Sequence, residues 1–171
     1  MAILPIVNVP DPVLRRKAKA VTKFDDKFQA LVDDMIETMR AAPGVGLAAP
    51  QVAVLERLIV VEYPEKEPET DDEEVTPRLY VIANPTITRK SPEVEPGTEG
   101  CLSVPGYQGE VERHLAITVK GLNRFGQPLT LKLKDWTARI FQHEIDHLNG
   151  VLFTDLATRI WKPEGPVEDR V

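Results

Sequence analysis

The sequence predicts a single α+β domain in which mostly antiparallel strands pack around a C-terminal helix. Three observations lead to this fold class. The chain has 171 residues, of which 42% are hydrophobic and 28% charged, and this length and composition suit one compact core over residues 1–171. Two segments repeat apolar residues at the helical period, and several shorter segments alternate apolar and polar residues as strands do. The sequence contains no internal repeat.

The first helix is expected over residues 24–39, where apolar side chains recur at helical spacing. Thr22 and Asp25 resemble a capping box at its start. Pro43 and Gly44 should end it, because a proline disfavours helical geometry in the residue before it.

Strands are expected at 57–63 and 79–82. Residues 65–77 lie between them and are rich in Glu, Asp and Pro, so they cannot bury apolar surface and should form a mobile acidic loop. Two further strands alternate at 115–119 and 129–133, and residues 123–127 look like the hairpin connection that joins them.

The second helix should begin at Asp135, a good N-cap residue, and end at Asn149 and Gly150. Its apolar face contains Ile140, Phe141, Ile145 and Leu148. The tail, residues 158–171, contains two prolines among charged residues, so an irregular segment is expected there.

Charge and hydropathy exclude several classes of function. The formal net charge is -6 and the pI about 5.2, which argues against nucleic acid as the main ligand. The longest apolar runs, such as residues 58–61, are far shorter than the roughly 20 residues of a membrane span. No basic residue precedes the short apolar stretch at the N-terminus, and Pro5 interrupts it, so no secretory signal is indicated and a cytoplasmic location is expected.

His143, Glu144 and His147 form an H-E-x-x-H pattern inside the second predicted helix. Residues four apart lie on one helix face, so both imidazoles can bind the same ion, while Glu144 can take a proton from a water molecule beside it. The alternative is an accidental spacing of two polar groups at the edge of the core. His114, on a predicted strand without a metal-type partner nearby, should be hydrated or hydrogen-bonded.

A third ligand is needed, and the sequence offers Asp155 and Glu164 downstream and Cys101 upstream. As the only cysteine, Cys101 cannot form an intrachain disulfide or a structural zinc site with two thiolates, but it could also be a small buried apolar residue. If Cys101 joins both histidines, three ligands leave one position open, as in catalytic sites. The expected chemistry is hydrolysis of an acyl compound.

Residues 44–49 match the dinucleotide pattern G-x-G-x-x-A, but a predicted helix precedes them and a strand follows, the reverse of the required order. Gly44 and Gly46 could instead let backbone approach a substrate closely. Gln51 could then donate its side-chain amide to a developing oxyanion. A tight turn with an exposed glutamine is the alternative.

Three motifs together resemble the signatures of the peptide deformylase family, in the family's order: GVGLAAPQ at 44–51, EGCLS at 99–103 and QHEIDHL at 142–148. The resemblance extends to VPDPVLR at 9–15 and GVLF at 150–153, and so covers most of residues 7–156. It implies a hydrolase that removes the formyl group from the N-terminal formylmethionine of new polypeptides and releases formate.

The resemblance also implies a role for individual residues and for an ion. The ion in similar enzymes is usually Fe²⁺, with Zn²⁺, Ni²⁺ or Co²⁺ able to replace it, and ligand chemistry alone would not choose among them. Glu144 would be the general acid and base, and Gln51 with the Leu102 backbone amide would hold the oxyanion. The implied metal ligands are Cys101, His143 and His147, and the implied substrate-binding residues are Val45, Gly46, Gly100 and Ile140.

The chain departs from many relatives in its acidic 65–77 loop and in a C-terminus that lacks the basic helix of some bacterial members. The second departure puts docking to the ribosome through such a helix in doubt, although transient contact with the ribosome remains an expectation. Two rival functions are an H-E-x-x-H endopeptidase, which would not need Cys101, and a non-catalytic metal-stabilised binding module, in which Glu144 and Gln51 would have no role.

Overall fold

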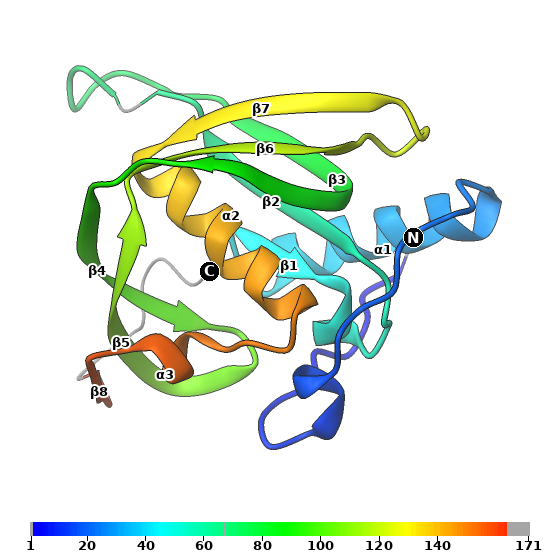
Figure 1. Ribbon diagram of the computed structural model, residues 1–171, viewed down its shortest axis with the longest axis horizontal. Helices are drawn as coiled ribbons and strands as arrows, with labels where there is room; N and C mark the ends of the chain where they lie inside the picture. The colour runs from blue at the N-terminus through cyan, green and yellow to red at the C-terminus, as the bar shows by residue number, and fades with distance from the viewer. Residues whose placement is uncertain (1, 67, 164–171) are drawn as a thin grey trace.

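The computed structural model describes residues 2–66 and 68–163, which fold into two antiparallel sheets and two long helices (Figure 1). Its helices are α1 (Asp26–Ala41), α2 (Asp135–Leu148) and the short α3 (Phe153–Leu156), with 3₁₀ turns at Pro12–Arg15 and Ala49–Val52. The α+β class predicted from the sequence is confirmed. None of the described helices has the length and apolar character of a membrane span.

The larger sheet has five strands in the order β1-β2-β3-β6-β7, all antiparallel. Their bounds are β1 Gly46–Ala48, β2 Leu58–Pro64, β3 Pro77–Lys90, β6 Ala116–Leu122 and β7 Pro128–Lys134. The first part of β3 pairs with β2 and its last part with β6, with register shifts after Ala83. The long strand thus joins the two halves of the sheet.

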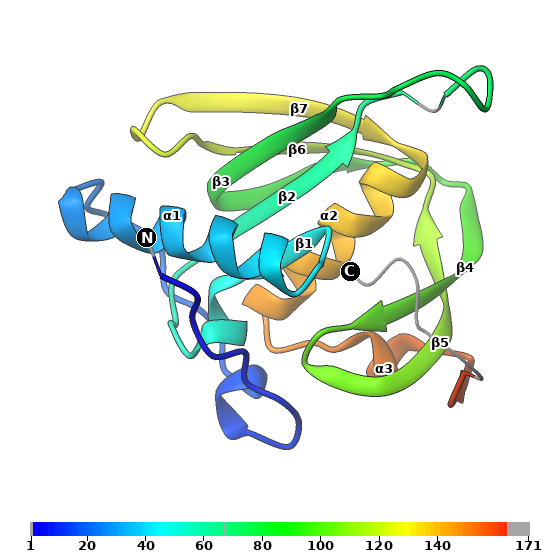
Figure 2. The same cartoon turned by 180° about the vertical axis from the view of Figure 1, so that it is seen from behind.

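Strand β2 explains how both helices attach to this sheet. Its residues 58–61 are all fully buried, and successive side chains point to opposite faces. Leu58 and Val60 pack in the cluster that holds α1, whereas Ile59 and Val61 pack in the cluster that holds α2. Figure 2 shows α1 running across β1 and β2.

The smaller sheet has the order β4-β5-β8, with β4 Val94–Cys101, β5 Val104–His114 and β8 Arg159–Trp161. Sequence patterns did not indicate β4 or β5, because Pro96, Gly97, Pro105 and Gly106 interrupt any apolar alternation. Backbone pairing in register from Val94 with His114 to Gly100 with Gln108 forms these strands instead.

Helix α2 lies between the two sheets (Figure 1), and residues 137–145 are all buried. It contacts β1 and β2 of the larger sheet and β5 of the smaller one. A segment that is amphipathic by sequence is therefore covered on its polar side too, and the polar residues on that side must find partners inside the protein.

Three local predictions need correction. The N-cap of α1 is Asp25, which accepts a hydrogen bond from the Phe28 N–H at 3.0 Å, and not the capping box of Thr22 with Asp25 that the sequence suggested. Asp135 is the first residue of α2 and has φ +56°, while Lys134 is its N-cap. The tail predicted as irregular contains β8, which pairs with β5; residues 164–171 lie outside the described part of the chain.

Candidate metal centre

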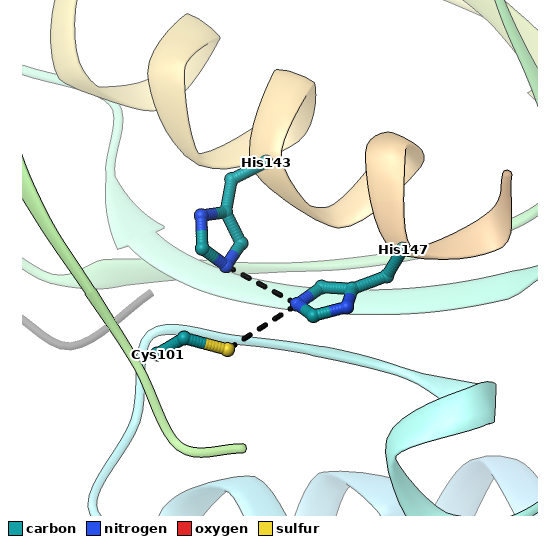
Figure 3. Close-up of side chains that lie close together, drawn as sticks. All are labelled: Cys101, His143 and His147. Atoms are coloured by element: carbon teal, nitrogen blue, oxygen red, sulfur yellow. Dashed lines mark hydrogen bonds between the residues drawn. The ribbon is translucent and has the colours of Figure 1, made fainter. Parts of the chain in front are cut away.

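Cys101, His143 and His147 converge at the junction of the smaller sheet and α2. Cys101 ends β4, and the two histidines extend from successive turns of α2 (Figure 3). The Cys101 Sγ and one ring nitrogen of each histidine all lie within 4.8 Å of one another. The two Nε2 atoms are 3.2 Å apart, and Cys101 Sγ is 3.4 Å from His147 Nε2. All three side chains are at most 2% exposed.

These separations suit a tetrahedrally coordinated divalent ion. Two nitrogens that each bind such an ion at about 2.0 to 2.1 Å are about 3.3 Å apart, and a thiolate at about 2.3 Å lies about 3.6 Å from either nitrogen. The chemistry of the donor set fits as well, because two imidazoles and a thiolate suit Zn²⁺, Fe²⁺, Co²⁺ and Ni²⁺. The residues present can therefore hold the metal that the pattern predicts.

The two histidines differ in the surroundings of Nδ1, the ring nitrogen that faces away from the other histidine's Nε2. His143 Nδ1 lies 2.9 Å from Glu99 Oε1, whereas His147 Nδ1 is buried and has no hydrogen-bond partner among the described residues. Burial by itself acts to lower the pKa of both imidazoles, because it disfavours the charged form. In His143, hydrogen bonds with Cys101 and Glu99 outweigh burial and raise the pKa to about 10, whereas burial and the charge of His143 keep the pKa of His147 well below its usual value.

Glu99 is a member of the site that the sequence did not reveal. Its carboxylate is fully buried and accepts hydrogen bonds from Arg113 and Arg139 as well as from His143. Burial raises the pKa of Glu99, but the hydrogen bonds from Arg113 and His143 outweigh it and hold that pKa well below its usual range. Arg113 also pairs with Asp146 at 2.6 Å, so these buried charges are mutually compensated.

Glu144 lies in the same buried region but is unpaired. Neither of its carboxylate oxygens has a hydrogen-bond partner among the described residues. A Cβ added at Gly46 would overlap this carboxylate, so the glycine lets the β1 backbone approach it closely. Burial raises the pKa of Glu144 to about 7, although the charge of His143 opposes this change. An unpaired buried carboxylate is typical of a functional group rather than a structural one.

Gln51 is fully buried, which excludes the exposed turn considered from the sequence. Its Oε1 accepts a hydrogen bond from the Ala48 N–H at 3.0 Å, and its Nε2 donates to Ser103 Oγ at 3.1 Å and contacts Cys101 Sγ at 3.6 Å. The amide is thus oriented toward the ligand cluster. Sequence reasoning assigned no role to Ser103.

Leu102 and Ser103 form the tight turn between β4 and β5. Leu102 therefore follows Cys101 directly at the edge of the cluster. Of the residues expected to bind substrate, Gly46 contacts Glu144, and Gly100 is buried beside Cys101. Val45 is half-buried, and Ile140 is fully buried in the core cluster around α2.

Other candidates lie elsewhere. Asp155 does not join the cluster; it pairs with Arg15 at 2.5 Å and accepts from the Leu152 N–H at 3.0 Å. Glu164 falls outside the described residues. His114 is hydrogen-bonded through Nδ1 to the Ser91 carbonyl at 2.7 Å, as expected. A cavity of about 810 Å³, lined by Tyr80, Ile117 and Leu133 among others, lies apart from these ligands, so its size does not mark the site.

Residues 44–49 do not have the arrangement of a dinucleotide-binding loop. Helix α1 precedes Gly44, and the glycines lead into β1 and a 3₁₀ turn. A dinucleotide fingerprint requires a strand before the glycines and a helix after them. The order of elements therefore agrees with the sequence analysis, which argued against a dinucleotide-binding loop at these glycines.

Comparison with known proteins places most of the chain in one family. Residues 3–162 match the family model described as polypeptide deformylase. The chain is 47% identical to the peptide deformylase of Desulforudis audaxviator over 162 residues, which cover 95% of this chain and 98% of that one. It is 50% identical to that of Symbiobacterium thermophilum over 160 residues, 94% of this chain and 69% of that one.

Solved structures agree with these matches. The peptide deformylase of Ehrlichia chaffeensis in complex with actinonin has a TM-score of 0.84 at 43% identity, with 93% of this chain and 91% of that chain covered. The peptide deformylase of Thermus thermophilus has a TM-score of 0.79 at 46% identity, with 90% of this chain and 85% of that chain covered.

Proposed function

The chain belongs to the polypeptide deformylase family, and we propose that Cys101, His143 and His147 hold its catalytic ion. It is a hydrolase that removes the formyl group from the N-terminus of new polypeptides. The observation that carries the assignment of the site is the convergence of one thiol and two imidazoles with separations that suit a tetrahedral ion.

A divalent ion bound there supplies Lewis acidity, which polarises a carbonyl oxygen and acidifies a water molecule. The chain's own residues perform the remaining tasks. Glu144 accepts a proton from the attacking water and donates one to the amine that leaves when the formyl C–N bond breaks. This role is supported by its two buried oxygens, which have no partner among the described residues and so remain free for water or substrate.

The Gln51 amide and the Leu102 backbone N–H stabilise the negative charge that develops on the formyl oxygen. Ala48 and Ser103 hold the Gln51 amide in place before substrate arrives, so little reorganisation is needed during the reaction. Both donors flank Cys101, one from the 3₁₀ turn after β1 and one from the turn after β4.

Substrate is bound along Val45, Gly46 and Gly100, with Ile140 lining an apolar pocket for the methionine side chain. The support for this placement is that Gly46 lies against Glu144 and Gly100 lies next to Cys101. An extended peptide beside β1 and β4 would present its N-terminus to both the metal ligands and the proton-handling carboxylate.

The finer assignments rest on the resemblance to peptide deformylases. We propose Fe²⁺ as the physiological ion, with Zn²⁺, Ni²⁺ or Co²⁺ able to occupy the same ligands. The substrate is a formylated nascent chain, so the enzyme acts in the cytoplasm and meets the ribosome transiently.

The direct test is to incubate anaerobically prepared, iron-loaded protein with formyl-Met-Ala-Ser and to measure formate. Wild type should release formate and Glu144→Ala should not, while both retain iron. Release of formate by Glu144→Ala at the wild-type rate would remove the proposed role of this residue. Cleavage of casein without formate release would favour an endopeptidase instead.

A further inference from the structure

The carboxylate of Glu99 connects His143 to Arg139, which lies one helical turn earlier on α2. His143 Nδ1 contacts Oε1 at 2.9 Å, and Arg139 Nη1 donates to Oε2 at 2.7 Å. Residues four apart on a helix share one face, so the two side chains approach the same carboxylate side by side. Each of them occupies a different oxygen atom of Glu99.

The contact with Glu99 fixes which ring nitrogen of His143 is available to bind an ion. An imidazole that offers Nε2 as a ligand must carry its proton on Nδ1, and a carboxylate that accepts this proton fixes both the tautomer and the ring orientation. His147 has no such support, because its Nδ1 lacks a partner among the described residues. The rigidity of the pair therefore depends on His143, and through it on what holds Glu99.

Arg139 is fixed by more than this carboxylate. It also donates to the Val111 carbonyl of β5 at 2.8 Å and to the Glu95 carbonyl of β4 at 2.7 Å. Its guanidinium lies against Gly97, where an added Cβ would come within 2.6 Å of Cζ and 2.7 Å of Nη2. The missing side chain at Gly97 thus leaves the space that the guanidinium occupies.

Arg113 plays a different part in the same network. It donates to both Glu99 oxygens at 2.9 Å and to Asp146 at 2.6 Å, and this bidentate contact both neutralises the carboxylate and fixes its plane. Arg139 contacts Oε2 alone, which leaves Oε1 available to His143. Arg139 therefore adds a second donor on the oxygen that His143 does not use, beside the bidentate contact of Arg113.

We infer that Arg139, seated in the space left by Gly97, is a positioning residue that together with Arg113 holds Glu99 in its orientation toward His143 and thereby strengthens metal binding. This inference rests on the proposed metal site. Removing the Arg139 guanidinium would leave Oε2 with Arg113 as its donor and would loosen the position of the carboxylate relative to His143. A Cβ added at Gly97 would fill this space and displace the Arg139 guanidinium, but it would leave every charged side chain of the network present.

The test compares zinc affinity in Arg139→Leu, Gly97→Ala and the double variant. The dissociation constant is measured by competition with a chromogenic chelator, and melting temperature is recorded in parallel. Each single substitution should raise the dissociation constant about tenfold, the lower end of the roughly 10- to 100-fold range for direct partners of metal ligands, because Arg139 acts through Glu99. The double variant should bind zinc no more weakly than Arg139→Leu, because the added Cβ then has no guanidinium to displace.

Arg57→Leu is the matched control. Arg57 donates to the Leu148 carbonyl and to Asn149 Oδ1, both at 3.0 Å, at the other end of α2. Its loss should lower the melting temperature without changing zinc affinity. If Arg139→Leu does not fold, Gly97→Ala alone decides the matter, since it removes no charge.

Two results would overturn the inference, and they are distinguishable. Wild-type protein that fails to bind zinc would remove the proposed metal site and this inference with it. Wild-type protein that binds zinc, with Gly97→Ala and any folded Arg139→Leu binding it as tightly, would remove the role of Arg139 and leave the proposed function standing.

Discussion

The side-chain amide of Gln51 lies 3.1 Å from the hydroxyl of Ser103, and both side chains are fully buried. The hydroxyl accepts a hydrogen bond from Gln51 Nε2, which is thereby held against Cys101 at the end of β4. A residue of the β4–β5 turn thus orients the group that would stabilise the oxyanion. Pre-orientation of this kind makes an oxyanion donor effective.

Ser103→Ala should therefore lower kcat about tenfold without loss of metal, less than the roughly 10²- to 10³-fold expected for Gln51→Ala. It should also destabilise the fold by about 1 to 3 kcal/mol, because the Gln51 amide loses a buried partner. Thr38→Val is a suitable control, since it removes another buried hydroxyl, in α1, that bonds Leu4 and Asp34. A fall in kcat of equal size in both variants would contradict a positioning role for Ser103.

Gly46→Ala should reduce turnover about 10²-fold while the protein keeps its metal. The added Cβ would meet the Glu144 carboxylate, with Cδ at 2.9 Å, and displacement of a reacting group by about 1 Å is enough for such a loss. At Gly44 the nearest neighbour is Leu102 Cδ1 at 2.8 Å, the end of a flexible side chain. Gly44→Ala should be milder, and measured kcat values for both variants check this order.

Asp155 should make a small, pH-dependent contribution to stability. The hydrogen bond from Arg15 lowers the pKa of Asp155 in the folded protein below its ordinary value of 3.8. A carboxyl whose folded pKa is depressed stabilises the fold above its unfolded pKa, and this stabilisation is lost as pH falls through the folded pKa. Both side chains are partly exposed, so the pair is worth at most about 1 kcal/mol.

Urea unfolding of wild type and Asp155→Asn can measure this contribution. The two proteins should differ above about pH 5, and the difference should shrink as the pH is lowered. The same difference at every pH would show that the charge of Asp155 is not responsible for it.

The iron-loaded protein should lose activity in air faster than the nickel-loaded protein. A thiolate ligand beside ferrous iron is open to oxidation of either the metal or the sulfur. Activity after timed exposure to oxygen, with anaerobic samples as reference, provides the comparison. Equal survival of the iron form with and without oxygen would exclude this explanation.

Sequence periodicity was sufficient for the two long helices because each has a continuous apolar face. It was insufficient for β4 and β5, whose prolines and glycines hide the strand pattern and whose pairing is settled by the opposite strand. The spacing of His143 and His147 likewise predicted that the two side chains lie together, and their Nε2 atoms are 3.2 Å apart. The partners of Glu99 could not be foreseen, since Arg113 and Arg139 lie 14 and 40 residues farther along the chain.

The position of α2 between two sheets should slow the hydrogen exchange of its backbone amides. Residues 139–145 lie beyond the first turn of α2 and are buried without interruption, so opening their backbone hydrogen bonds requires the surrounding core to open as well. Amide protons there should exchange only through global unfolding, at rates that follow denaturant with the full slope of the unfolding reaction. His143 and Glu144, which the proposed function places at the ion and the proton, would then lie in the slowest-exchanging unit of the described structure.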